Sequence, residues 1–183
     1  MGKAGPVDIK AEVIYGVGTN EYTGGKPDQD VSGFGVYAGA TMPIAGLTLG
    51  LEGAYVSGDD PKTADNEGAF ASDYQSPFWS IILFNNLDYN GYQNESVTGP
   101  APSDSGMKNA FGVKPSVSVQ LMPGLSLYGA LVYAVRNEDV GTKKADPLGT
   151  EVDVVVNYAI TPNVGWTVGG GFLMAGDFYG DVK

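Results

Sequence analysis

The sequence predicts an all-β protein, folded as a transmembrane antiparallel up-and-down β-barrel or as part of one, with about seven or eight strands. Apolar residues recur at every second position through seven segments, the pattern of strands with one apolar face. Each segment has about ten residues, which span a bilayer when tilted, whereas strands of soluble proteins peak near five or six. The connections alternate between tight turns and long polar loops, an asymmetry typical of transmembrane barrels.

The first three strands are expected at residues 7–18, 33–42 and 47–56. In residues 7–18 apolar side chains occupy the odd positions, and charged side chains occupy the even positions from Asp8 to Glu12. The other two segments alternate apolar residues with Gly and Thr. In each segment one face is therefore apolar and the other is small or polar.

The last four strands are expected at residues 111–121, 125–135, 151–160 and 164–174. Val and Leu dominate the apolar positions, and Ser, Gln, Tyr and acidic residues stand between them in most of the segments. No segment with helical periodicity competes with these strands. Seven strands is an odd number, so the first and last strands would run in the same direction.

The connections differ in length from one end of the predicted sheet to the other. The tight turns are residues 43–46, 122–124 and 161–163, and residues 3–6 resemble a further turn of this kind. The long connections, rich in Gly, Asp and Asn, are residues 19–30, 57–108 and 136–149. When the chain is followed up and down, all tight turns fall at one end, so residues 57–108 are expected to form a long outer loop.

The composition excludes several classes of function. The chain has no Cys and no His, which rules out a disulfide framework, a zinc–thiolate site and a Ser-His-Asp triad. The net charge is −11 and Arg136 is the only arginine, so a nucleic-acid partner is not expected. No nucleophile–base pair, metal-ligand spacing or phosphate loop is visible, so we expect neither an enzyme nor a cofactor.

Three segments resemble Gram-negative outer-membrane porins of the large type, distantly like the alginate-export channel. These are residues 9–16, the strand end and acidic loop at residues 53–60, and the Pro-Gly-Leu-Ser-Leu-Tyr segment at residues 123–128. The resemblance implies a barrel in the bacterial outer membrane, in contact with its lipid and with lipopolysaccharide. Periplasmic turns would be short, and the activity would be passive transport of solutes.

The end of the chain departs from that family. Such porins finish on a strand with a terminal aromatic residue, whereas residues 178–183 read as the start of an outer loop. Together with the odd strand count, this departure favours a C-terminal fragment of a larger barrel, lacking its final strand. In the alternative, residues 78–84 add an eighth strand to a small closed barrel.

The polar face of the predicted strands is expected to line a lumen. Five of its charged residues are acidic and two are basic, which favours small cations and neutral solutes over a polyanion such as alginate. Lys114 could instead pair with a carboxylate of the lumen. The expected pore-lining residues are Asp8, Lys10, Glu12, Tyr37, Glu52, Lys114, Ser116, Gln120, Tyr128, Glu151, Asp153 and Asn157.

Aromatic residues gather within the long loop, most densely between residues 70 and 92. A run this apolar does not remain free in water, so it enters the pore as a constriction or plug, packs on a neighbouring subunit, or caps the barrel wall. The candidate constriction residues are Phe78, Trp79, Phe84 and Tyr89. The acidic loop at residues 59–67 lacks EF-hand spacing, so no metal site is assigned to it.

These observations lead to three hypotheses of function. The first is an outer-membrane pore for passive diffusion of small ions and solutes, with a mild preference for cations. The second is a non-conducting structural or adhesive barrel of the same membrane, and the third is a soluble lipocalin-like binder. In the membrane, the chain would be a homo-oligomer or would join the remainder of a larger barrel.

Overall fold

The computed structural model describes residues 2–67, 78–84, 107–139 and 144–179. Their helices and strands comprise eight β-strands and one turn of 3₁₀ helix, η1 (Asp177–Tyr179). The strands are β1 (Gly2–Ala4), β2 (Val7–Asn20), β3 (Gln29–Ile44), β4 (Leu47–Val56), β5 (Ala110–Met122), β6 (Leu125–Arg136), β7 (Pro147–Thr161) and β8 (Val164–Ala175).

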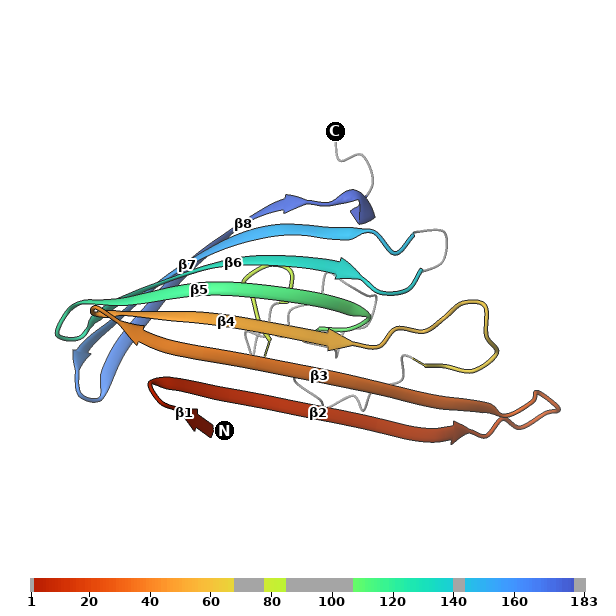
Figure 1. Ribbon diagram of the computed structural model, residues 1–183. Helices are drawn as coiled ribbons and strands as arrows, with labels where there is room; N and C mark the ends of the chain where they lie inside the picture. Colours follow the sequence, from red (N-terminus) through yellow and green to blue (C-terminus); the bar gives the residue numbers. More distant parts are fainter. Residues whose placement is uncertain (1, 68–77, 85–106, 140–143, 180–183) are drawn as a thin grey trace.

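All eight strands form one antiparallel sheet in which each strand pairs with its neighbours in the sequence (Figure 1). This confirms the predicted all-β, antiparallel, up-and-down architecture, and the seven alternating segments are the strands β2 to β8. The eighth strand is the short β1 at residues 2–4. Residues 78–84, which one alternative assigned to an eighth strand, form a turn instead, so that alternative is wrong for this segment.

Several strands extend beyond the segments that periodicity marked. The β2–β3 pairing continues to Asn20 opposite Gln29, and there the Thr19 hydroxyl donates a hydrogen bond of 3.2 Å to Asp30. β7 begins at Pro147, which lies opposite Val135. These extensions depend on backbone pairing, and at Thr19 also on a side-chain hydrogen bond, neither of which an alternation of apolar residues reveals.

Short turns join the strands at one end of the sheet, and the long connections lie at the other end (Figure 1). The β3–β4 turn has positive φ at both central residues, 50° at Ala45 and 83° at Gly46. This backbone suits the right-handed twist of a two-residue hairpin. Gly124 has a φ of 82° in the β5–β6 turn, so glycine again occupies a left-handed position.

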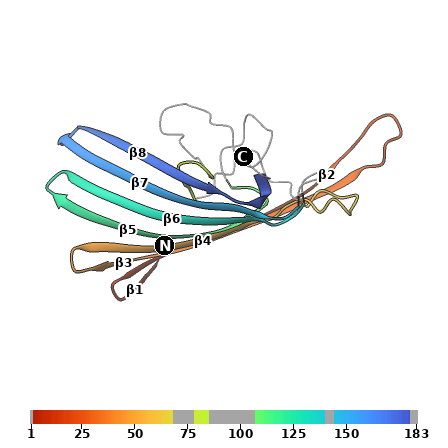
Figure 2. The same ribbon diagram turned by 90° about the horizontal axis from the view of Figure 1, so that it is seen from above.

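The described part of the sheet is curved and open, not closed into a barrel (Figures 1 and 2). β2 and β8 run in the same direction, because six antiparallel steps separate them. They therefore cannot pair with each other in antiparallel fashion. β1 covers only residues 7–9 of the outer edge of β2, so the rest of that edge is unpaired within the described residues.

The convex face of the sheet is apolar and exposed. Val13 is 73% exposed, Leu51 60% and Phe172 67%, and in the strand pairing each of these side chains points to the same face as its apolar neighbours. Aromatic pairs lie on this face as well, including Tyr158 against Trp166 with ring centroids 6.0 Å apart.

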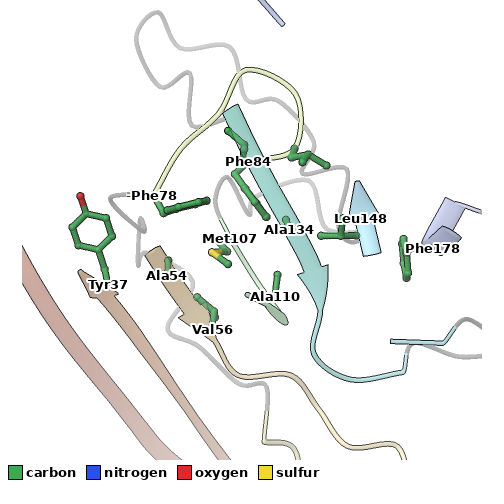
Figure 3. Close-up of a cluster of buried hydrophobic side chains, with 12 residues drawn as sticks. Tyr37, Ala54, Val56, Phe78, Phe84, Met107, Ala110, Ala134, Leu148 and Phe178 are labelled. Atoms are coloured by element: carbon green, nitrogen blue, oxygen red, sulfur yellow. The ribbon is translucent and has the colours of Figure 1, made fainter. Parts of the chain in front are cut away.

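The concave face carries the core, on the side of the sheet where residues 78–84 lie (Figure 2). Near the long connections this face is apolar, and side chains from outside the strands fill it (Figure 3). Near the short turns it is polar. The core residues are Tyr37, Ala54, Val56, Phe78, Leu83, Phe84, Met107, Ala110, Val132, Ala134, Leu148 and Phe178.

Candidate functional site on the concave face

The twelve residues that the sequence marks as pore-lining all point to the concave face. Residues that lie opposite each other in an antiparallel pair share a face, as do residues two apart in one strand. Pairs such as Glu12 with Tyr37 and Glu52 with Lys114 link β2 to β5, and Ser126 with Asn157 links β6 to β7. The register therefore brings the twelve side chains together, from both halves of the chain.

Lys114 lies at the centre of this face and is almost completely buried. Its ammonium group forms an ion pair of 2.9 Å with Glu52 on the neighbouring strand. It also donates a hydrogen bond of 3.0 Å to the carbonyl of Trp79, and it lies 4.8 Å from the centre of the Trp79 ring. A buried charge needs partners of this kind, because an unpaired one is strongly destabilising. Lys114 thus joins β4, β5 and residues 78–84.

Glu151 and Asp153 lie two residues apart on β7 and are 0% and 1% exposed. Both oxygens of Glu151 accept main-chain hydrogen bonds, from Ile82 at 2.6 Å and from Leu83 at 2.8 Å. Asp153 accepts one from the amide of Ile81 at 3.2 Å. Three successive amides of one turn therefore converge on two carboxylates, as backbone amides do in anion-binding nests. These carboxylates contact the turn and are shielded from solvent.

Residues 78–84, named the inner segment below, are folded by their own hydrogen bonds. The amide of Phe84 donates to the Ser80 hydroxyl at 2.9 Å, and the amide of Ser80 donates to the Phe84 carbonyl at 3.1 Å. Phe78 and Phe84 meet edge to face with centroids 5.6 Å apart, and both are fully buried. The turn is therefore a compact unit with an apolar underside.

The inner segment packs on the concave face through Phe78, Trp79 and Phe84, three of the four residues proposed for a constriction. Phe78 and Phe84 join the core, and Trp79 stacks on Tyr128 with centroids 5.9 Å apart. The fourth candidate, Tyr89, lies outside the described residues. The sheet's own concave face is thus the surface that this turn covers.

The polar residues nearer the short turns are open to solvent. Asp8, Lys10 and Glu12 on β2 are exposed, as are Gln120 and Asn157. Asn157 accepts a hydrogen bond of 2.6 Å from the Thr167 hydroxyl of β8. Gln120 donates hydrogen bonds to the carbonyls of Met122 and Leu125, at 2.6 and 3.0 Å. Lys3 of β1 lies opposite Asp8 and pairs with it at 3.4 Å, so the charged part of this open region carries two carboxylates and two ammonium groups.

Sequence reasoning missed the apolar half of the concave face. Ala54, Val56, Val132 and Ala134 occupy positions of the polar register, yet they are buried in the core. The sequence did contain a signal of this burial. In residues 129–135 no side chain is charged, and only Tyr133 carries a polar group. Here the concave positions are apolar because they join the core and the convex positions are apolar although they are exposed, so the alternation is lost.

Phe178 of η1 completes the core at the end of the sheet that carries the long connections. There the guanidinium carbon of Arg136 lies 4.4 Å from the centre of the Phe178 ring. Phe178 is buried beside Leu148 and Ala134 (Figure 3). η1 therefore folds back over the concave face after β8, and a segment distant in sequence from residues 78–84 helps to fill the same core.

Among the described residues no group of acidic side chains has a geometry that would hold a metal ion. No helix in this part of the chain is long and apolar enough to cross a membrane. Comparison with protein families and with curated proteins finds no match for this chain.

Proposed function

We propose that this chain forms the wall, or part of the wall, of a bacterial outer-membrane pore for passive diffusion of small ions and solutes, resembling the large porins. The observation that carries the proposal is the contrast between the two faces. Large apolar side chains are exposed along the convex face from β2 to β8, whereas charged and polar groups face the concave side. A patch this extensive marks a surface that meets lipid or another protein.

The carboxylates of the concave face support the mild cation preference. In the exposed region Asp8 and Glu12 are matched by Lys3 and Lys10, and deeper on the face Glu52 is paired with Lys114. Rings of carboxylates favour cations in pores. The support for a cation preference therefore comes from Glu151 and Asp153, which form no ion pair within the described residues.

The unpaired edges of the sheet restrict which strands could complete the wall of the pore. Hydrocarbon cannot satisfy unpaired backbone groups, so a sheet in a bilayer must have both edges paired. β2 and β8 run in the same direction, so the strands that pair with them must run opposite to both, and the number of completing strands must be odd. In a homo-oligomer of uniform orientation, the three-residue β1 is the one edge strand among the described residues that could pair antiparallel with β8 of a neighbour. We therefore favour the remainder of a larger barrel over a homo-oligomer.

Planar-bilayer recording tests the proposal. Refolded together with the strands that complete the barrel, the chain is expected to give discrete conductance steps, with a reversal potential in a KCl gradient that shows K⁺ passing more readily than Cl⁻. Insertion into vesicles without conductance would instead support the non-conducting structural or adhesive barrel. The packed core near the long connections favours this second candidate, since it fills part of the concave face.

Solubility separates the third hypothesis from the other two. A monomer that stays in aqueous buffer without detergent would contradict an outward apolar face and would support a soluble binder. The expected result is aggregation in buffer and recovery in detergent or lipid.

A further inference from the structure

We propose that the inner segment is a reversible plug, latched by Glu151 and Asp153, and that its release exposes these two carboxylates as cation-selecting residues of the pore. The inference rests on the proposed function and adds to it a closed state, an open state and the residues that distinguish them. Three features of the concave face carry it.

The first feature is the way in which the two carboxylates are satisfied. Their hydrogen bonds come from the amides of Ile81, Ile82 and Leu83. Within the described residues neither carboxylate forms an ion pair, because Lys114 directs its ammonium group to Glu52 and to the Trp79 carbonyl. One oxygen of Asp153 is buried without any partner. If the turn leaves, two carboxylates remain on the wall, where only water and mobile cations can satisfy them.

The second feature is a cradle of glycines in the wall. A Cβ at Gly171 would lie 2.8 Å from Oδ1 of Asp153, 3.0 Å from Oε1 of Glu151 and 3.1 Å from Cβ of Ile81. One at Gly169 would lie 3.3 Å from Cδ1 of Ile81. A Cβ at Gly112 would lie 2.8 Å from the ring of Phe78. Any larger residue at these positions would press against the turn. Strands from both sides of the latch therefore lack side chains where the inner segment sits.

The third feature is the surface that the latched turn presents. Phe78, Leu83 and Phe84 are buried beneath it, and Trp79, Ile81 and Ile82 are half-buried at its surface. The latched state covers two carboxylates with aromatic and aliphatic side chains. Release would thus both widen the passage and increase its negative charge, so conductance and cation preference are expected to rise together.

A disulfide can hold the plug in place, because the chain contains no cysteine of its own. The positions are Ile81 and Gly171, whose Cβ separation of 3.1 Å needs only a small adjustment to reach the 3.5–4.5 Å of a disulfide. I81C/G171C is recorded in planar bilayers, in the completed barrel, before and after reduction with dithiothreitol. The single variant G171C is the matched control, because its new Cβ meets the carboxylates of Asp153 and Glu151 in the same way.

Reduction of the double variant is expected to raise the conductance and the K⁺/Cl⁻ permeability ratio together, with no change in the control. Equal conductance and equal reversal potential before and after reduction would overturn the plug. A rise in conductance without a rise in the permeability ratio would overturn the role of the two carboxylates.

A second double variant tests whether Glu151 and Asp153 hold the inner segment and select cations, or only form a structural contact. E151Q/D153N removes both charges, which weakens charge-assisted hydrogen bonds about twofold. The Glu151→Gln change also leaves only one acceptor oxygen, so one of the amides of Ile82 and Leu83 meets an NH₂ donor instead. The expected result is more frequent opening with a lower permeability ratio. Opening with an unchanged ratio would contradict the assignment of selectivity to Glu151 and Asp153.

Fluorescence gives a readout that does not depend on conduction. In W166F the only tryptophan is Trp79, on the plug. Acrylamide is expected to quench it more strongly after reduction of I81C/G171C in that background. Quenching that changes without any conductance would support the plug and refute the pore, whereas quenching that does not change would refute the plug.

Discussion

Val154→Lys should prevent stable insertion, because it places an ammonium group on the convex face at the middle of β7. Val154 is the central residue of the strand Pro147–Thr161 and is 47% exposed. Its partners across the sheet are Gly129 and Gly170, neither of which has a side chain to cover the new charge. The lysine would therefore lie in hydrocarbon, if this face meets lipid.

The size of the expected loss in folding stability follows from the position of residue 154 in the bilayer. A lysine at the midplane of a transmembrane barrel costs about 2–4 kcal/mol. Since each 1.4 kcal/mol is a factor of ten, the ratio of folded to unfolded chain should fall by about 30-fold to 1,000-fold. Asn157→Lys, on the exposed concave face of the same strand, loses the hydrogen bond from Thr167 and should cost about 1 kcal/mol or less.

Urea unfolding in lipid vesicles measures both variants, with Val154→Leu as the control for side-chain size. The expected order of unfolding midpoints is wild type and Val154→Leu highest, Asn157→Lys slightly lower, and Val154→Lys much lower or not folded. If Val154→Lys inserted normally while Asn157→Lys did not, the lipid-facing and solute-facing sides would be reversed and the pore proposal would be refuted.

Lys114→Met should lower the unfolding midpoint, because it leaves Glu52 without its 2.9 Å ion pair, and adding Glu52→Gln should restore part of the loss. Removal of one partner of a buried pair costs about 3–5 kcal/mol, and the part-exposed Glu52 places the expected loss at or below the lower end. A double variant less stable than Lys114→Met would contradict this pairing. Gly171→Val should displace the inner segment together with the carboxylates that hold it, since its Cβ would lie 2.8 Å from Asp153 and 3.1 Å from Ile81, and should increase acrylamide quenching of Trp79. Gly170→Val, which has nothing within 4 Å on the convex face, should not. Equal quenching in the two variants would show that the glycine cradle does not seat the plug.

The sequence predicts most of the sheet because one physical property determines it. A strand with one face in an apolar environment must alternate, so residues such as Val13, Leu51 and Val154 mark their strands without any structural information. Strand ends are less visible. At Asn20 and Gln29 the pairing continues through polar residues, whose contribution comes from backbone hydrogen bonds that have no signature in hydropathy.

The concave face was only half predictable. Its residues could be listed, since strand register follows from alternation, but their environments could not. Nothing in the local sequence around Glu151 indicates that amides about 70 positions earlier would bury its carboxylate. Such a contact depends on the path of a long connection, which periodicity does not constrain. The inner segment was recognised from its aromatic residues, whereas its anchor on β7 was visible only in three dimensions.

Cysteine scanning along β7 tests the central claim that the convex face meets lipid and the concave face meets water. The chain has no native cysteine, so each single variant from residue 154 to residue 157 reports one side chain. In vesicles, a water-soluble maleimide is expected to label positions 155 and 157 and to leave 154 and 156 unlabelled, although 154 is exposed on the protein itself. Labelling of 154 at the rate of 157 would contradict the account, because it would place the convex face in water.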